Sequence, residues 1–580
     1  MYYNFLVKIP ENTGKISYNK RKNATYVEYT YDRVYNPEKK YNIAKRTTIG
    51  KVSEEDDTVM YPNPSFEKFF PDVLLPEENT EVFRSSCVKV GTYIVIKKII
   101  KDYKLFDHLT SWDERGKGLL LDCAAYSIIT ESNAAQHYPE YAYNHPLMTP
   151  KHTIYSDSTI SRFFSEISFD DRIDFLNSWN KNTNPNDPIY ISYDSTNKHC
   201  KAGNIEMVEY GHPKTDVGAP IFNYAVAYDL YNQKPLLYED YPGSITDVSQ
   251  LHDLVEKFKG YGYKNLAFVL DRGYFSRENI HFMKSCGYDY LIMVKGKASF
   301  VNKLILERKG TFETDRSNAI KAYRTYGITI NTKLYQEDNE NCYFHLYHKS
   351  SRESAERIKL ENALERMEET MDKAKGKEGK LPKAFEHYYE LTYHGSKFYG
   401  YKERKDVIEK ELKLCGYFAI VTSKNMSAEE ALVLYKNRDA SEKLFCSDKS
   451  FPGNSSLRVA GNNALESKVF VEFIALIIRN KIYTLLKNRM AEMAKKPNFM
   501  TVPGAIRELE KIELIRQPGG NYKLDHAITA TQKTILGAFG IDGDIMRTKA
   551  LAVGRELENS EIPEKEKEET YGTYEDYEIN

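Results

Sequence analysis

Apolar and polar residues alternate through the first part of the chain. The segments ATYVEYTYDRVY (24–35) and GTYIVIKKII (91–100) show this most clearly, and a period of two predicts β-strands. Further on, apolar positions recur every three or four residues, as in DSTISRFFSEISF (157–169), which predicts helices. We therefore expect a β-rich region at residues 1–110 and a helical region at 111–185.

Short apolar runs and amphipathic segments make up residues 186–298. Three strands are predicted in succession, and a helix, a strand, a second helix and a fifth strand follow them. This order indicates a mixed sheet covered by helices. The segments are PIYISYDST, APIFNYAVAYDL, KPLLYEDYPG, LHDLVEKF, NLAFVLDRG, RENIHFMKSC and YLIMVKG.

Residues 299–413 interrupt this order with strand-like segments around a long charged helix (351–379), and we expect an inserted β-rich domain there. The core resumes over residues 414–500 with the strand GYFAIVTS and a helix that the capping-box sequence SAEE opens. Residues 501–580 form a C-terminal helical region with an acidic tail. The predicted fold class is α/β, a mixed-sheet core interrupted by a β-rich insertion, with N-terminal β/α and C-terminal α-rich regions.

One segment of the second core part, LYKNRDASEKLFCSDKS (434–450), gathers polar residues on one face of a helix. Residues on an α-helix advance by about 100° each, so Tyr435, Arg438 and Glu442 fall within about 60° of one another. Lys449 joins them if the helix continues that far. A surface helix with ordinary ion pairs gives a similar pattern, although these four residues border the apolar face instead of lying opposite it.

Two aspartates directly follow apolar strands, Asp194 after PIYISY and Asp271 after NLAFVL. An ionised carboxylate in such a position is costly unless it is paired, hydrated or bound to a metal, and sites in α/β sheets gather at the carboxyl ends of strands. The sequences DST and DRG also suit simple turns. If Glu442 joins the two aspartates, the three carboxylates form an oxygen-only set that suits Mg²⁺ or Mn²⁺.

Charge is balanced over the whole chain but unevenly placed. The net charge is −1, yet residues 1–51 hold 11 Lys or Arg and 4 Asp or Glu, and residues 556–580 hold 2 Lys and 10 Asp or Glu. A basic arm and an acidic tail fit a DNA partner, and they equally fit two solvated termini. The basic segments YNKRKN (18–23) and IVIKKIIKDYK (94–104) are the candidates for DNA binding.

The cysteines and the longest apolar run give expectations about the compartment. Seven cysteines are scattered without a CxxC pair, which indicates reduced thiols and a cytoplasmic protein. The longest apolar run, VFVEFIALII (469–478), contains Glu472 and is too short to span a bilayer. We therefore expect no membrane partner.

In combination, three motifs resemble those of the DDE catalytic core of bacterial insertion-sequence transposases, which has a ribonuclease-H-like fold. DST (194–196) resembles the first-Asp motif and DRGYFS (271–276) the second. Tyr435, Arg438, Glu442 and Lys449 reproduce the family's Y-x2-R-x3-E-x6-K spacing. YPGSITD (241–247) resembles the stretch before the family's core helix, and a β-rich insertion separates the second Asp from the Glu in the family. The resemblance covers roughly residues 186–480.

The resemblance implies a cut-and-paste DNA transposase. Asp194, Asp271 and Glu442 would bind two Mg²⁺ ions, with Mn²⁺ as a substitute, for hydrolysis at the transposon ends and attack of the freed 3′-OH on target DNA. Tyr435, Arg438 and Lys449 would hold the DNA. The expected partners are double-stranded DNA of the terminal inverted repeats and of the target, and a second copy in a homodimer, in the bacterial cytoplasm at the nucleoid.

Two other classes of function remain open from the sequence. The same fold could serve a host-recruited nuclease or a non-mobile DNA-binding factor. The carboxylates could also belong to a sugar- or nucleotide-processing hydrolase that uses acid–base chemistry without metals.

Overall fold

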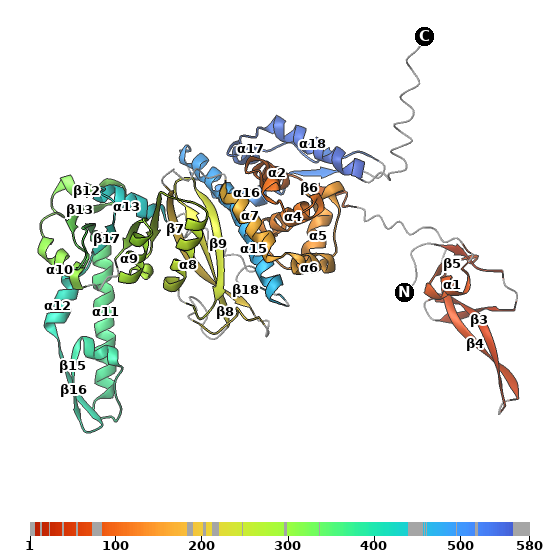
Figure 1. Ribbon diagram of the computed structural model, residues 1–580. Helices are drawn as coiled ribbons and strands as arrows, with labels where there is room; N and C mark the ends of the chain where they lie inside the picture. Colours follow the sequence, from red (N-terminus) through yellow and green to blue (C-terminus); the bar gives the residue numbers. More distant parts are fainter. Residues whose placement is uncertain are drawn as a thin grey trace, which may run out of the picture. The chain divides into compact units, whose positions relative to one another are not determined.

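The computed structural model divides the chain into two compact units, residues 1–83 and 84–580 (Figure 1). Each unit has a hydrophobic core of its own. The described residues are 6–11, 14–21, 24–37, 40–53, 56–71, 73, 84–181, 189–200, 205–211, 220–245, 247–294, 299–335, 337–438, 456–457, 459, 461–494, 496–516 and 520–560.

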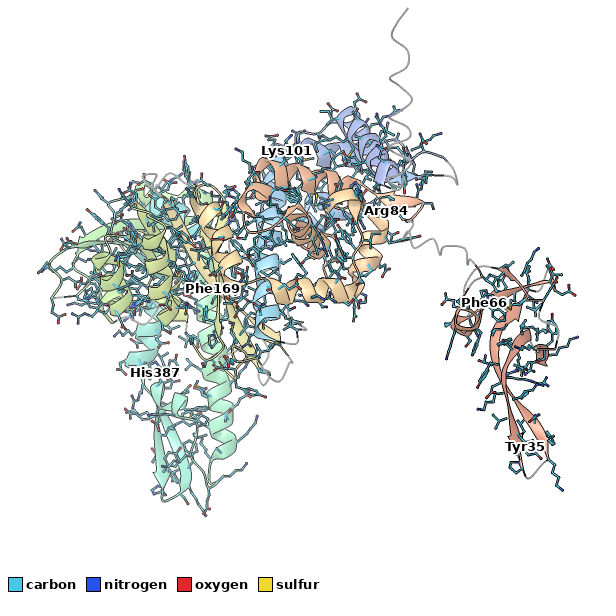
Figure 2. All side chains as sticks on the ribbon, turned by 45° about the vertical axis from the view of Figure 1, so that its right-hand side comes forward. Tyr35, Phe66, Arg84, Lys101, Phe169 and His387 are labelled. Carbon is cyan, nitrogen blue, oxygen red and sulfur yellow. The ribbon has the colours of Figure 1, made fainter. Side chains whose placement is uncertain are left out.

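The first unit is an antiparallel five-stranded sheet with one short helix. The strands lie in the order β1-β5-β4-β3-β2, and segment 24–35 forms a strand as predicted. Helix α1 (Pro64–Phe69) begins after Asn63, whose side-chain oxygen accepts hydrogen bonds from the N–H groups of Ser65 and Phe66. Phe66 then packs into a small core under the sheet (Figure 2). The strands are β1 (Val7–Lys8), β2 (Ile16–Arg21), β3 (Ala24–Asn36), β4 (Tyr41–Val52) and β5 (Val59–Pro62).

The second unit begins with helices, and one of them corrects a prediction. The alternation in residues 91–100 predicts a strand, but helix α2 (Gly91–Asp102) occupies this segment. The segment is apolar at most positions, so both periods fit it. Ile96, Ile99 and Ile100 are buried whereas Lys97 is exposed, so packing overrides the β preference of isoleucine. The helices that follow are α3 (Leu105–His108), α4 (Glu114–Thr130), α5 (Tyr138–Asn144), α6 (Asp157–Glu166) and α7 (Phe169–Lys181).

The C-terminal segments pack on these helices. Strand β19 (Glu513–Ile515) pairs with β6 (Cys87–Lys89) and β20 (Lys523–Leu524), and α18 (Gly543–Ser560) contacts α2. The remaining C-terminal helices are α16 (Val502–Leu509) and α17 (Ala530–Gly537). Helices from both ends of the unit therefore form one helical region.

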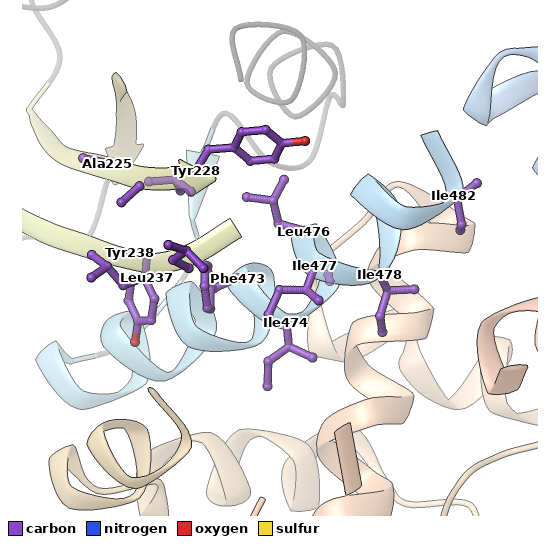
Figure 3. Close-up of a cluster of buried hydrophobic side chains, with 14 of the residues drawn as sticks. Ala225, Tyr228, Leu237, Tyr238, Phe473, Ile474, Leu476, Ile477, Ile478 and Ile482 are labelled. Carbon is purple, nitrogen blue, oxygen red and sulfur yellow. The ribbon is translucent and has the colours of Figure 1, made fainter. Parts of the chain in front are cut away.

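A long helix, α15 (Asn462–Ala491), connects this helical region to the central sheet. It contacts both α4 and strand β9 (Lys234–Pro242). Figure 3 shows Phe473 of α15 beside Leu237 and Tyr238 of β9, and the ring centroids of Phe473 and Tyr238 lie 4.9 Å apart. Contacts of this kind bury most of the helix, as its apolar sequence requires. No helix within the described ranges combines the length and apolar character needed to cross a membrane.

The central sheet has the predicted mixed α/β, ribonuclease-H-like order. Its first five strands in the chain are β7 (Ile189–Cys200), β8 (Ile221–Asp229), β9, β10 (Leu266–Leu270) and β11 (Asp289–Met293). They lie side by side in the order β9-β8-β7-β10-β11. β7, β10 and β11 run parallel, and β8 is antiparallel to both of its neighbours. Helices α8 (Asp247–Gly260) and α9 (Arg277–Ser285) connect the later strands.

Only part of the insertion folds apart from the central sheet. Strands β12 (Ala319–Ile320), β13 (Thr325–Thr332) and β14 (Cys342–His348) extend the central sheet, because β14 pairs with β17 (Tyr417–Thr422) and β17 pairs with β11. The hairpin of β15 (Tyr389–His394) and β16 (Lys397–Glu403) instead packs on the charged helix α11 (Ser350–Ala374) around its own small core. The insertion also holds α10 (Ser299–Arg308) and α12 (Lys405–Leu414). Three of the five described strands of the insertion, β12, β13 and β14, are thus part of the main sheet.

Candidate active site

The two aspartates singled out in the sequence lie on neighbouring strands of the central sheet. Asp271 follows the end of β10 as predicted, but β7 does not end at Asp194 and continues to Cys200. In the parallel pair of β7 and β10, Ser192 is opposite Val269. Two residues further along each strand are Asp194 and Asp271, which follow the same register. Adjacent strands are about 4.8 Å apart, and residues opposite each other in a parallel pair point to the same face. Asp271 stands immediately after the end of β10, so its carboxylate is at the rim of the sheet.

Local hydrogen bonds hold both carboxylates. Asp271 caps a short 3-10 helix (Arg272–Tyr274), and its Oδ1 accepts a hydrogen bond from the Arg272 N–H at 2.7 Å. The Oδ1 atom of Asp194 accepts from the Ser195 N–H at 2.9 Å. The Asp271 side chain is still 42% exposed. Its carboxylate is therefore oriented by the backbone while remaining open to a ligand.

Helix α13 (Ala428–Asn437) brings two further predicted residues to Asp271. The helix begins with the expected capping box between Ser427 and Glu430. From its last turn, the Tyr435 hydroxyl donates to Asp271 Oδ1 at 3.2 Å. Arg438, the C-cap, places Nη2 at 4.0 Å from the same oxygen, with its guanidinium carbon 5.3 Å from the Tyr435 ring centre. Both residues are only 5% exposed, so they support this carboxylate from below the surface.

Two predicted site residues, Glu442 and Lys449, lie outside the described residues. Helix α13 ends at Asn437, so the shared helical face is observed only for Tyr435 and Arg438. The structure thus brings together Asp194, Asp271, Tyr435 and Arg438, four of the six residues expected at the site.

The two faces of β7 differ in what supports them. Side chains alternate along a strand. The Tyr193 hydroxyl points to the side of α8 and donates to Glu239 at 2.8 Å, and burial raises the pKa of this hydroxyl well above its usual value. Lys198 points to the other side, where it forms a buried ion pair with Glu472 of α15. Asp194 shares the face of Lys198, the face that α15 covers further along the strand.

The buried pair of Lys198 and Glu472 was missed by the sequence analysis. A carboxylate inside the apolar run VFVEFIALII needs a partner when it is buried, and this is the signal that could have predicted one. The lysine itself gives no such signal, because its partner is 274 positions away in the chain. The pair joins β7, the strand of Asp194, to the helical region.

The carboxylates fit a divalent cation. Two aspartates on neighbouring strands repel each other when both are ionised, and a cation between them removes that penalty. Carboxylate oxygens are the ligands that Mg²⁺ prefers. Within the described ranges, no group of three or more His, Cys, Asp and Glu side chains forms a metal cluster, and the expected third ligand, Glu442, lies outside those ranges.

The structure also places the basic segment 94–104. It lies in and after α2, which lines a groove of about 1310 Å³ together with α18. The lysines that line the groove are Lys97, Lys98, Lys101, Lys104, Lys151 and Lys549, and the acidic residues are Asp102, Asp107 and Glu556. Two of the lysines are paired, Lys97 with Glu556 and Lys98 with Asp102. The segment 18–23 contributes its described residues to β2 of the first unit.

One comparison with known proteins agrees with the resemblance to DDE transposases. The family model described as transposase DDE domain matches residues 188–478, half of the chain. No curated protein matches the chain. Among solved structures, a piggyBac transposase synaptic complex with hairpin DNA is similar at 7% sequence identity and a TM-score of 0.35, over 82% of this chain and 86% of that one.

Proposed function

The chain belongs to the transposase DDE domain family, and we propose that it is a cut-and-paste DNA transposase. It hydrolyses a phosphodiester at each end of a mobile element and then joins the freed 3′-OH to target DNA. The observation that carries this proposal is the contact of Tyr435 and Arg438 with Asp271. Tyr435 and Arg438 lie far from Asp271 in the chain. An unrelated hydrolase would have no reason to place the Tyr and the Arg of the family's motif beside this one carboxylate.

The residues have distinct roles in this proposal. Asp194, Asp271 and Glu442 hold two Mg²⁺ ions, or Mn²⁺ in their place. When bound, such a pair of ions activates a water molecule and neutralises charge on the phosphate. Tyr435 fixes one oxygen of Asp271 by its hydrogen bond. Arg438, buried behind Asp271, adds positive charge from below the site, and Lys449 supplies positive charge beside the scissile phosphate.

The partners follow from the reaction. Transposition joins two ends of one element, so we propose a homodimer in which each copy binds one terminal inverted repeat before target DNA enters. The lysines of the groove between α2 and α18 would hold DNA phosphates during this step. We place the protein in the cytoplasm, acting on nucleoid DNA.

Cleavage of the DNA that flanks the coding region tests the proposal. The purified full chain is incubated with a plasmid carrying both flanks, with Mg²⁺ or with EDTA. We expect cuts at the ends of the element only with the metal. Asp194→Asn, Asp271→Asn and Glu442→Gln should each lower the cleavage rate by at least about 10³-fold and leave DNA binding intact.

A matched control is Asp289→Asn. Asp289 starts β11, at the opposite edge of the same sheet, and pairs with Lys424 at 3.0 Å. This variant should cleave like the unmodified protein. Cleavage that survives EDTA would instead support a metal-independent carboxylate hydrolase. Flanks without inverted repeats would favour a nuclease or DNA-binding factor that no longer moves an element.

A further inference from the structure

Strands β3 and β4 of the first unit run well beyond the strands beside them. β2 pairs with β3 only as far as Tyr29, and β5 pairs with β4 only from Gly50 onwards. The remaining pairs, from Thr30 opposite Arg46 to Asn36 opposite Tyr41, form a two-stranded ribbon. We call residues 30–36 and 41–46 the ribbon. Figure 2 labels Tyr35 in it, far along the hairpin from Phe66 in the core.

The ribbon exposes large apolar side chains. Between 39% and 59% of the surface of each of five residues is exposed, namely Tyr31, Val34, Tyr35, Tyr41 and Ile43. Tyr31 stacks on Phe69 of α1, with the ring centroids 5.3 Å apart. The other four lie further along a two-stranded hairpin, which is marginally stable by itself in water. An exposed apolar patch of this kind marks an interaction site.

Both faces of the ribbon combine apolar side chains with a cation. Opposite residues of an antiparallel pair share a face. Tyr35 lies two residues beyond Arg33 on the same face. The other face carries Val34 opposite Ile43, Tyr41 opposite Asn36, and Lys45, which pairs with Asp32 at 3.4 Å. Each face thus carries an exposed aromatic ring and a cation, as expected for an element that a partner surrounds.

The charge of the surrounding surface identifies the partner as an anion. Among the described residues from 14 to 53, eight are basic and two are acidic. A protein-binding patch is normally poor in lysine, whereas nucleic-acid surfaces need such a basic excess. The basic residues are Lys15, Lys20, Arg21, Arg33, Lys40, Lys45, Arg46 and Lys51, and the acidic ones are Glu28 and Asp32.

We propose that the ribbon is a DNA-binding arm that enters the major groove of a duplex. That groove is about 12 Å wide and admits a two-stranded ribbon. Arg33 and Arg46 of the ribbon, together with Lys40 directly before Tyr41, contact the phosphates that border it. Tyr35 and Tyr41, on opposite faces near the end of the ribbon, contact the base edges on either side of the inserted hairpin. The choice of double-stranded DNA rests on the proposed function, and the arm is a binding surface additional to the carboxylate site.

Binding of the full chain to a labelled duplex from either flank of the coding region tests the arm. Fluorescence anisotropy in EDTA separates binding from cleavage. Arg33→Ala and Lys40→Ala should each reduce the slope of log K against log salt concentration by about 1. Tyr35→Ala and Tyr41→Ala should each weaken binding by about 10-fold. Circular dichroism should show that each variant is folded.

The hairpin of β15 and β16 supplies matched controls. Tyr399 is 67% exposed on β16, and Lys402 is exposed on the same strand. Tyr399→Ala and Lys402→Ala should leave affinity and salt slope unchanged. The arm is rejected if the unmodified chain binds no duplex, if the ribbon variants bind like the controls, or if they change only self-association, as measured by light scattering. Binding that depends on the ribbon without any metal-dependent cleavage would overturn the proposed function and leave the arm standing.

Discussion

The central sheet and the ribbon are both made of β-strands, but side chains are buried in the first and exposed in the second. Every residue of β8 and β10 is buried, whereas residues 31–35 of β3 are all exposed. Burial on both faces fixes the register of a strand, so Asp194 and Asp271 are held beside each other before any ligand arrives. Exposure on both faces leaves apolar surface for a partner. The proposed roles of the two regions fit that difference, since catalysis needs fixed geometry and recognition needs open surface.

The largest expected difference between the central sheet and the ribbon is the stability lost when one aromatic side chain is removed from each. Phe268 of β10 is fully buried, and its ring centroid lies 6.0 Å from that of Phe258 and 6.0 Å from that of Tyr288. Phe268→Ala should lower the free energy of unfolding of the second unit by about 3–5 kcal/mol. Tyr35→Ala in the ribbon should change that of the first unit by less than about 0.5 kcal/mol. Urea denaturation of both variants measures this, and a cost at Tyr35 comparable to that at Phe268 would show that the ribbon is packed.

The same contrast explains which features the sequence could predict. The strands of the core and the place of Asp271 follow from apolar runs that end in an aspartate, a local pattern. The expected strand end at Asp194 is wrong, because β7 continues through Asp194 to Cys200. The approach of Tyr435 to Asp271 followed only from the family's motif spacing, since periodicity places a residue on a face and does not name its partner.

Features that depend on distant partners could not be predicted. Strand β14 pairs with β17, with His348 opposite Tyr417, and no local pattern in either strand encodes that register. The insertion therefore looked like a separate domain. The strand prediction for residues 91–100 was wrong for a related reason. The nearly continuous apolar sequence fits a strand or a helix, and only the packing of α2 against α18 and α15 decides between them.

A second test of this contrast compares how the stability of the central sheet and that of the first unit depend on pH. His345 of β14 is fully buried between the hydroxyls of Thr329 and Thr422, at 2.9 and 3.2 Å, and this burial lowers its pKa to about 4. Its neutral form therefore contributes stability that is complete above pH 6.5 and is lost as the pH falls from 6.5 toward 4. The loss should reach about 3 kcal/mol.

Replacing the histidine isolates this contribution. His345→Gln should be less stable than the unmodified chain at pH 7, and the gap between their unfolding free energies should shrink by about 3 kcal/mol at pH 4. In the first unit, by contrast, Asp56 is the one described residue with a shifted pKa. Hydrogen bonds from Thr58 lower the pKa of this carboxyl, which is fully exposed. A gap at His345 that stays constant with pH would mean that the imidazole is accessible to protons in the folded sheet.

The smallest expected effect concerns two tyrosine hydroxyls on opposite faces of the central sheet, those of Tyr435 and Tyr193. Tyr435→Phe removes the hydroxyl that donates to Asp271 Oδ1 at 3.2 Å but keeps the ring and its packing. Because the Arg272 N–H still holds the same oxygen at 2.7 Å, the cleavage rate at saturating DNA should fall only about 5-fold, equivalent to about 1 kcal/mol. Tyr193→Phe, on the opposite face, removes a hydrogen bond to Glu239 and should lower stability while leaving the cleavage rate unchanged. Equal losses of rate in both variants would show that Tyr435 acts through the stability of the sheet and not through Asp271.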